Sequence, residues 1–223
     1  TRYPDITVEY ETIYHSVTYK DWDGTVLYTE ILVEGSNATD PVTSGKIDAP
    51  IRPNTDDVRY VYTGWGTLPT NITSSVELTA KYAESYALRF YNDTTIITTV
   101  FVSAGGNGVY QGTEPTREST AQYDYAYTGW ALTNGGEADA NALNNITAPR
   151  NVYAAYSATI RKYTVKFYNG NALMYEQQNV EYGTNATYGS ETVPTKAMDA
   201  QFIYTFDGWS RSNNNVTDDT ALL

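Results

Sequence analysis

Short runs of alternating apolar and polar residues recur along the whole chain and predict β-strands. The run "YTVKF" places Tyr163, Val165 and Phe167 on one face of an extended segment, because successive side chains of a strand point to opposite faces. Val, Ile, Thr and Tyr dominate these runs, and Gly and Asn fill the turns between them. The strongest helix candidate is the short segment "TKAMDAQ", for which a turn or an irregular crossover is an equal alternative. The pattern predicts a mainly β protein, α+β at most.

One aromatic–Gly–Trp phrase occurs three times, as "YTGW" at 62–65 and 127–130 and as "FDGW" at 206–209. Aromatic residues stand five and three positions before each tryptophan. A proline stands fifteen positions before it and is followed two residues later by a basic residue. The sets are Trp65 with Tyr60, Tyr62, Pro50 and Arg52; Trp130 with Tyr125, Tyr127, Pro115 and Arg117; and Trp209 with Tyr204, Phe206, Pro194 and Lys196.

Strands before and after this phrase follow the same frame. An alternating strand precedes each copy and carries Val17 and Tyr19, Leu88 and Phe90, or Val165 and Phe167. An Asn-(Ile/Val)-Thr triplet follows each copy, at Asn71, Asn145 and Asn215, and a closing strand ends at Tyr82 or Tyr156. Equivalent tyrosines at positions 10, 82 and 156 are 72 and 74 residues apart. This period is too long for a solenoid repeat and suits a small domain.

The frame divides the chain into tandem modules, expected to follow one another like beads on a string. Residues 1–10 are expected to be the closing strand of a preceding repeat, with Ile6, Val8 and Tyr10 on one face. The repeats are expected at 11–83, 84–157 and 158–223, the last without its closing strand. We therefore expect the polypeptide to continue beyond at least one end of this sequence.

The recurring aromatic and glycine positions are predicted to form the core of each module. Glycine permits a tight turn or a close backbone approach after the strand, and the tryptophan then folds back over the small core. The residues assigned this role are Tyr62, Gly64, Trp65, Tyr127, Gly129, Trp130, Phe206, Gly208, Trp209, Tyr19, Phe90, Phe167, Tyr82 and Tyr156.

The full pattern, "YTVKFYNG…VEYG…P-x-K…YTFDGWS…(I/V)T…V-x-A-x-Y", resembles the Listeria–Bacteroides repeat, also called the internalin B-repeat. The resemblance covers essentially the whole chain, because the pattern can be aligned with it three times, once for each Gly–Trp phrase. It implies small β-grasp-like modules strung in tandem, as in bacterial surface proteins and some bacteriophage structural proteins. This sequence departs from the family pattern in its many tyrosines and in an insertion after Trp130, "ALTNGGEADANAL".

Composition narrows the range of partners. The net charge of −12 argues against a nucleic-acid partner, which would need clustered Lys and Arg. No apolar run reaches the roughly 18–20 residues that span a bilayer, so we expect no membrane insertion. The absence of cysteine excludes disulfides and thiolate chemistry within this sequence.

Candidate chemical groups are few, and each has a plain structural interpretation. The single histidine, His15, lacks a Ser or Asp pairing of the kind a catalytic triad needs. Neither Asp21 and Asp23 nor Asp218 and Asp219 match a spaced calcium loop, so turn carboxylates are favoured over Ca²⁺ ligands. The "GGNG" at 105–108 lacks the Lys-Ser/Thr of a phosphate loop and indicates a hairpin turn. We expect no catalytic residue, metal or cofactor.

Other side chains offer structural and binding interpretations. Arg52, Arg117 and Lys196 recur, so we expect each to pair with an acidic neighbour or to cover an aromatic face, with ligand binding as the alternative. Trp22 and Tyr110 fall outside the recurring positions and would carry any binding of a glycan.

These observations favour a non-enzymatic tandem-repeat structural protein. We expect a stalk, spacer, fibre or decoration, with an adhesive role as a further option, located extracellularly on a virion or a bacterial cell surface. Its partners would be other subunits of that assembly. The alternative is a module that binds a carbohydrate or a host receptor. An enzyme would require a deep pocket lined by residues that break the repeat.

Overall fold

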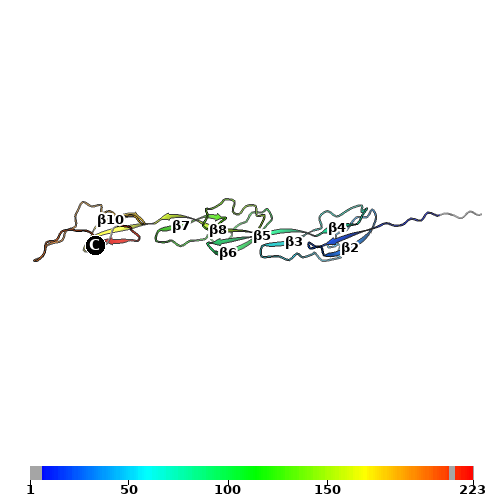
Figure 1. Ribbon diagram of the computed structural model, residues 1–223, viewed down its shortest axis with the longest axis horizontal. Coiled ribbons are helices and arrows are strands. Elements are labelled where there is room, and N and C mark those ends of the chain that lie inside the picture. Colours follow the sequence, from blue (N-terminus) through cyan, green and yellow to red (C-terminus); the bar gives the residue numbers. More distant parts are fainter. Residues whose placement is uncertain (1–6, 211–213, 223) are drawn as a thin grey trace, which may run out of the picture. The chain divides into compact units, whose positions relative to one another are not determined.

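The computed structural model describes residues 7–210 and 214–222, and the side chains among them up to Asp219. This part of the chain contains strands and no helix, so the mainly β prediction is confirmed, and "TKAMDAQ" is irregular. The strands (Figure 1) are β1 Tyr14–Lys20, β2 Val26–Val33, β3 Val58–Gly64, β4 Val76–Thr79, β5 Lys81–Asn92, β6 Thr95–Ser103, β7 Tyr123–Ala131, β8 Arg150–Ile160, β9 Lys162–Asn169, β10 Ala172–Glu181 and β11 Thr220–Leu222.

The strands form three sheets with the orders β2-β1-β4, β10-β9-β11 and β3-β5-β8-β7, where β6 also pairs with β5. The chain divides into two compact units. The first contains the described residues up to Tyr91, Thr95–Tyr110 and Leu143–Val152. The second contains Asn92–Thr94, Gln111–Ala142 and the described residues from Tyr153 onwards.

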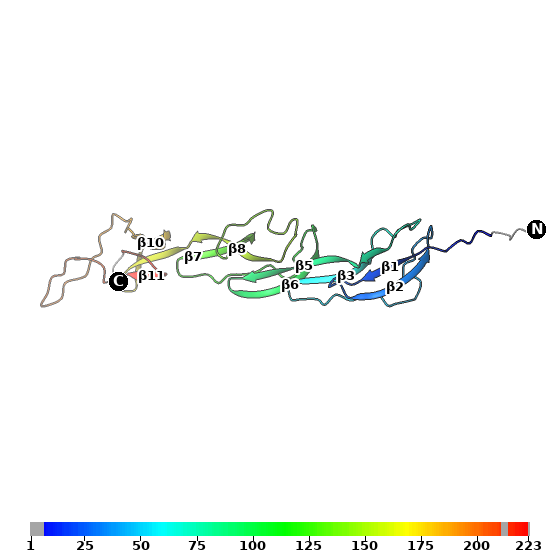
Figure 2. The same cartoon turned by 45° about the vertical axis from the view of Figure 1, so that its right-hand side comes forward.

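The first and third sheets share one arrangement. β1 and β2 form an antiparallel hairpin (Figure 2), in which Tyr14 pairs with Val33. β4 adds to the other edge of β1 in parallel. β9, β10 and β11 repeat this arrangement, and Leu222 pairs with Phe167 as Leu78 pairs with Tyr19. The third repeat therefore contains the start of a closing strand at Thr220–Leu222.

Consecutive repeats are joined through a strand rather than through a linker. The first residues of β5 pair antiparallel with β3, and its Tyr86 pairs with Val58. The same strand continues to Asn92 and also pairs with β6. β5 thus passes through residues 83 and 84, where the repeat pattern places a boundary.

The N-terminal segment differs from the expectation of a closing strand. Residues 7–13 form no strand, and Val8 and Tyr10 are 73% and 90% exposed. Within the described residues, this segment has no counterpart of β3 to pair with. Ile6 lies outside the described residues.

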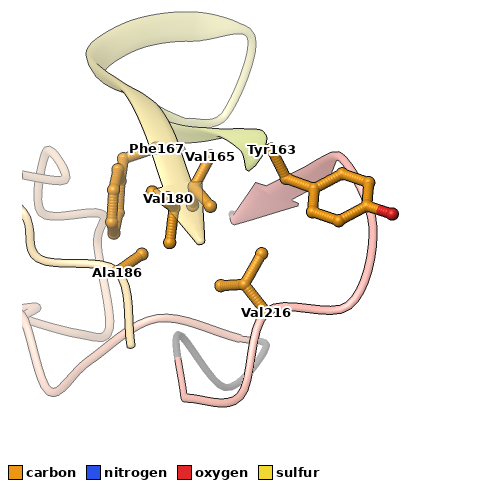
Figure 3. Packing of buried hydrophobic residues seen from close by; sticks show 6 residues of the cluster. All are labelled: Tyr163, Val165, Phe167, Val180, Ala186 and Val216. Carbon is orange, nitrogen blue, oxygen red and sulfur yellow. The ribbon is translucent and has the colours of Figure 1, made fainter. Parts of the chain in front are cut away.

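The core of each module is built around the first strand of its hairpin. Val17, Tyr19, Leu88, Phe90, Val165 and Phe167 are all 0% exposed, because alternation turns these side chains to the interior. In the last module, Val165 and Phe167 from β9 and Val180 from β10 face Ala186 and Val216 (Figure 3). Tyr163 belongs to the same cluster, with its ring directed away from Ala186.

The tryptophans pack on this core edge-to-face. The Trp65 ring centroid lies 5.0 Å from that of Tyr19, and the Trp209 centroid lies 4.9 Å from that of Phe167. Trp65 and Trp130 are buried, and the half-buried Trp209 packs against the core of its module. Phe206 differs from the core assignment: its side chain is 44% exposed, although its ring lies 5.3 Å from that of Trp209.

The remaining assigned positions lie beside this core. Tyr62 and Tyr127, which are half-buried, each meet the tryptophan three residues later and the tyrosine of the closing strand, Tyr82 or Tyr156, at centroid distances of 5.8–6.1 Å. The three glycines before the tryptophans all have positive φ, which glycine adopts without strain. These values are 122° for Gly64, 139° for Gly129 and 154° for Gly208.

A second recurring feature joins a Gly-x-Asn segment to the Asn-(Ile/Val)-Thr triplet. In the first repeat the Asn71 N–H donates to Asn37 Oδ1 at 2.9 Å, and Gly35 N donates to the Ile72 carbonyl at 2.8 Å. The same two bonds recur for Asn145 with Asn107 and for Asn215 with Asn185. "GGNG" is therefore part of this asparagine pair rather than only a hairpin turn.

Candidate functional site

Each repeat stacks its basic residue on the aromatic ring eight positions further along the chain. The distances from the charged group to the ring centroid are 3.7 Å for Arg52 over Tyr60, 4.1 Å for Arg117 over Tyr125 and 4.0 Å for Lys196 over Tyr204. The prediction that these residues cover an aromatic face is confirmed. Such a contact at an exposed site is worth about 0.5–1 kcal/mol.

The two arginines of this set differ in their other partners. Arg52 Nη2 donates to the Tyr60 hydroxyl at 3.1 Å, and Arg52 Nη1 lies 3.8 Å from Glu84 Oε1. Glu84 stands two residues after the closing-strand tyrosine of its repeat, and the corresponding residue of the second repeat is Ala158. Among the residues that the structure describes, Arg117 has no ion pair.

A polar cavity of about 520 Å³ lies beside Arg117. Its wall includes Asn134, Gly135 and Gly136 from the insertion. In the other two repeats, the tryptophan and the following asparagine are six positions apart, whereas Trp130 and Asn145 are fifteen apart. The cavity therefore lies where the second repeat departs from the other two.

Hydrogen bonds fix the polar side chains of this cavity. Tyr156 donates its hydroxyl hydrogen to Asn92 Oδ1 at 2.8 Å, and Asn92 Nδ2 donates to the Thr116 carbonyl at 2.9 Å. Asn134 Nδ2 donates to Asp93 Oδ1 at 2.9 Å and ties the insertion to the turn after β5. Burial raises the pKa of Tyr156, and the hydrogen bond with Asn92 and, to a smaller extent, the charge of Arg117 oppose this rise. The cavity thus presents amide, carboxylate and guanidinium groups in fixed positions.

A second depression, in the other compact unit, is less suited to an anionic ligand. It is lined by Arg59 and Arg89 together with Asp56 and Phe101. Arg89 Nη2 is 2.6 Å from Asp57 Oδ1 and also donates to the Asp56 carbonyl. Arg59 lies over Phe101, with its Cζ 3.7 Å from the ring centroid. The charge of Arg89 is therefore already compensated.

The aspartates and the histidine singled out in the sequence have local structural partners. Asp21 Oδ1 accepts the Tyr82 hydroxyl at 2.6 Å, and Asp23 Oδ1 accepts Thr25 N, a bond that lowers the pKa of Asp23. Asp219 Oδ1 accepts Thr164 N at 2.9 Å. His15 Nε2 is 3.3 Å from Glu34 Oε2. Within residues 7–210 and 214–222, no group of three or more metal-ligating His, Asp or Glu side chains occurs.

The two aromatic residues expected to carry glycan binding have different surroundings. Trp22 is 46% exposed, and the Arg52 guanidinium lies 5.1 Å from its ring centroid. Tyr110 is half-buried, with its ring 5.1 Å from that of Phe90. Tyr188 also packs on the equivalent core residue, Phe167, with a centroid distance of 5.3 Å. Both tyrosines follow the glycine of the Gly-x-Asn segment by five positions, a signal that would have identified Tyr110 as a packing residue.

No family model matches the chain, and no curated protein matches it. Among solved structures, the chain is similar to "Streptococcal High Identity Repeats in Tandem (SHIRT) domains 3-4 from cell surface protein". The identity is 9%, the alignment covers 66% of this chain and 99% of that chain, and the TM-score is 0.22. A TM-score this low carries no argument about function. A helix long and apolar enough to cross a membrane does not occur in the described part of the chain.

Proposed function

We propose that this chain is a non-enzymatic, load-bearing spacer, a stalk or fibre segment displayed outside the cell on a bacterial surface or a virion. The observation that carries the proposal is the parallel pairing of β1 with β4, the first and last strands of one module. Val17 pairs with Val76 and Lys20 pairs with Thr79. The partners of such a spacer are the subunits at its two ends.

Parallel pairing determines how the module responds to tension. The chain enters β1 at Tyr14 and leaves β4 at Thr79, so these two points lie at opposite ends of the strand pair. Tension applied between them shears the strands along their length and loads their hydrogen bonds together. Tension on an antiparallel hairpin, applied at its open end, breaks the bonds one after another.

The path of the chain after β4 extends this resistance. Ala80 N donates to the Lys20 carbonyl at 2.9 Å, so the parallel ladder continues beyond Thr79. β5 begins at Lys81 and pairs next with β3. Because no flexible linker stands between these pairings, tension passes from one set of hydrogen bonds directly into the next.

Composition and the pattern of recurrence support the same role. The net charge of −12 favours solubility at high local concentration. The groups that recur from repeat to repeat are the stacked cations, the aromatic core and the asparagine pair, and each contributes to packing or to backbone hydrogen bonding. The residues that recur from repeat to repeat in this chain are therefore residues with structural roles.

Single-molecule pulling tests the proposal. The chain has no cysteine, so two introduced cysteines define the points of attachment. One variant carries Tyr14→Cys and Lys81→Cys and shears β1 against β4. The matched variant carries Tyr14→Cys and Val33→Cys and unzips β1 from β2, because Tyr14 and Val33 are paired. We expect a severalfold higher unfolding force in the first variant, and equal forces would refute the load-bearing role.

A further inference from the structure

We propose that the cavity beside Arg117 binds an acidic saccharide, with the ligand carboxylate on the Arg117 guanidinium and its hydroxyl groups on Asp93 and the asparagine amides. This inference is independent of the spacer role. It rests on two differences between the second repeat and the first. One is the insertion, and the other is the missing carboxylate partner of the stacked arginine.

The first difference supplies a cavity. Asn134, Gly135 and Gly136 belong to the insertion, and they line the cavity together with Tyr156, whose counterpart in the first repeat is Tyr82. The volume of about 520 Å³ falls within the roughly 300–1,000 Å³ of small-ligand sites. The hydrogen bond between Asn134 and Asp93 holds the insertion in place, so the wall is formed before a ligand arrives.

The second difference supplies an uncompensated positive charge. In the first repeat, Glu84 lies 3.8 Å from the stacked Arg52, whereas Ala158 takes that place beside Arg117. The Arg117 guanidinium carbon lies 4.1 Å from the Tyr125 ring centroid, and this stacking holds the guanidinium beside the cavity that Arg117 lines. A planar guanidinium with several N–H donors is suited to a carboxylate.

The other lining groups select a ligand rich in hydroxyl groups. Asn92, Asn134 and Asp93 offer amide and carboxylate groups held by hydrogen bonds, and the polar residues outnumber the apolar lining of Ala154, Ala155 and the Tyr156 ring. Asp93 carries a negative charge, so a polyanion would be repelled. Its Oδ1 is engaged by Asn134, and a hydroxyl group can donate to its second oxygen. One carboxylate together with several hydroxyl groups describes a uronic acid.

Titration of the full chain with sodium glucuronate, followed by amide NMR, tests the site. We expect shifts confined to residues around the cavity, including Gly135, Gly136 and Ala155. Arg117→Gln should weaken binding at least tenfold, and the matched variant Arg52→Gln should leave binding unchanged. Ala158→Glu, which introduces the partner found in the first repeat, should also weaken binding at least tenfold and should retain the melting temperature of the parent chain.

Three probes separate the parts of the proposal. Glucuronate should bind, whereas glucose, which lacks the carboxylate, and acetate, which lacks the hydroxyl groups, should each bind at least tenfold more weakly. Glucose binding as tightly as glucuronate would overturn the role of Arg117, and acetate doing so would overturn the saccharide assignment. Absence of any shift with glucuronate would overturn the site and leave the outcome of the pulling experiment unaffected.

Discussion

The side-chain oxygen of Asn107 accepts a hydrogen bond from the backbone N–H of Asn145 at 2.9 Å. Asn145 has φ of 48°, in the left-handed region that Asn tolerates better than most residues. Ile146 follows Asn145, and its carbonyl accepts a hydrogen bond from the N–H of Gly105. The side chain of Ile146 is 0% exposed. These two hydrogen bonds therefore connect two loops that are far apart in the sequence, and they hold the buried side chain of Ile146 in the core.

Asn107→Ala should destabilise the chain by about 0.5–1.5 kcal/mol, because the N–H of Asn145 loses its acceptor. Asn145→Ala should cost about 1–2 kcal/mol from the left-handed backbone. Asn145→Gly is the matched control, since glycine adopts this φ freely. Urea unfolding measures all three, and a glycine variant no more stable than the alanine variant would contradict the role given to φ.

Trp130→Ala should lower the free energy of unfolding of the second repeat by about 3–5 kcal/mol, enough to unfold a small module. Trp130 is 7% exposed and packs edge-to-face on Tyr127 at 5.8 Å. Trp22→Ala is the matched control, because Trp22 is 46% exposed, and it should change stability by less than about 1 kcal/mol. Thermal melts followed by circular dichroism compare them, and an unchanged midpoint for Trp130→Ala would refute the prediction.

Asp21→Asn should be nearly neutral, whereas Asp21→Ala should cost about 1–3 kcal/mol, because the partly buried Tyr82 hydroxyl then lacks its acceptor. The second repeat already has an asparagine at the equivalent position. Asn92 accepts a hydrogen bond from the Tyr156 hydroxyl at 2.8 Å, as Asp21 does from the Tyr82 hydroxyl in the first repeat. Urea unfolding distinguishes the two substitutions. Equal destabilisation by both would show that the charge of Asp21, rather than its hydrogen bond, is what matters.

Tyr62→Phe should leave stability at neutral pH unchanged or increase it by up to about 1 kcal/mol. The Tyr62 hydroxyl is buried and has no hydrogen-bond partner among the described residues. Phe206 stands at the equivalent position of the third repeat, so phenylalanine is already compatible with this place in the frame. A loss above about 1 kcal/mol on urea unfolding would show that the hydroxyl has a role.

The same substitution should also reduce sensitivity to alkali. Burial, and secondarily the charge of Asp40, raises the pKa of Tyr62 to about 12 from the ordinary value of 10.0. The folded state therefore holds this proton more strongly than the unfolded state does. The resulting stability is fully present below about pH 10 and is lost as the pH rises from about 10 to about 12. The stability of Tyr62→Phe should fall less steeply over this interval, and parallel curves would contradict the assignment.

The strands and the basic residues show how far the sequence could be interpreted. Alternation identified Val165 and Phe167 as inward-facing, because a strand has a side-chain period of two and a one-sided core leaves a clear trace. The recurrence of Arg117 predicted either an acidic partner or an aromatic face, and only the structure shows that the ring is that of Tyr125. The asparagine pair was missed because Asn107 and Asn145 are separated by a variable distance, which a search at constant offsets cannot detect.

The sequence by itself determined a mainly β protein, the spacing of the Gly–Trp phrases and most of the residues from which the cores are built, with Phe206 as the exception, because these depend on local periodicity. The β-grasp-like module and the family resemblance remain predictions. Only the tertiary structure decided that β1 and β4 pair in parallel, that β5 continues through a repeat boundary, and that a cavity opens beside Arg117. These features depend on which distant segments meet, and strand direction and pairing partner leave no local trace in a short run of alternating residues.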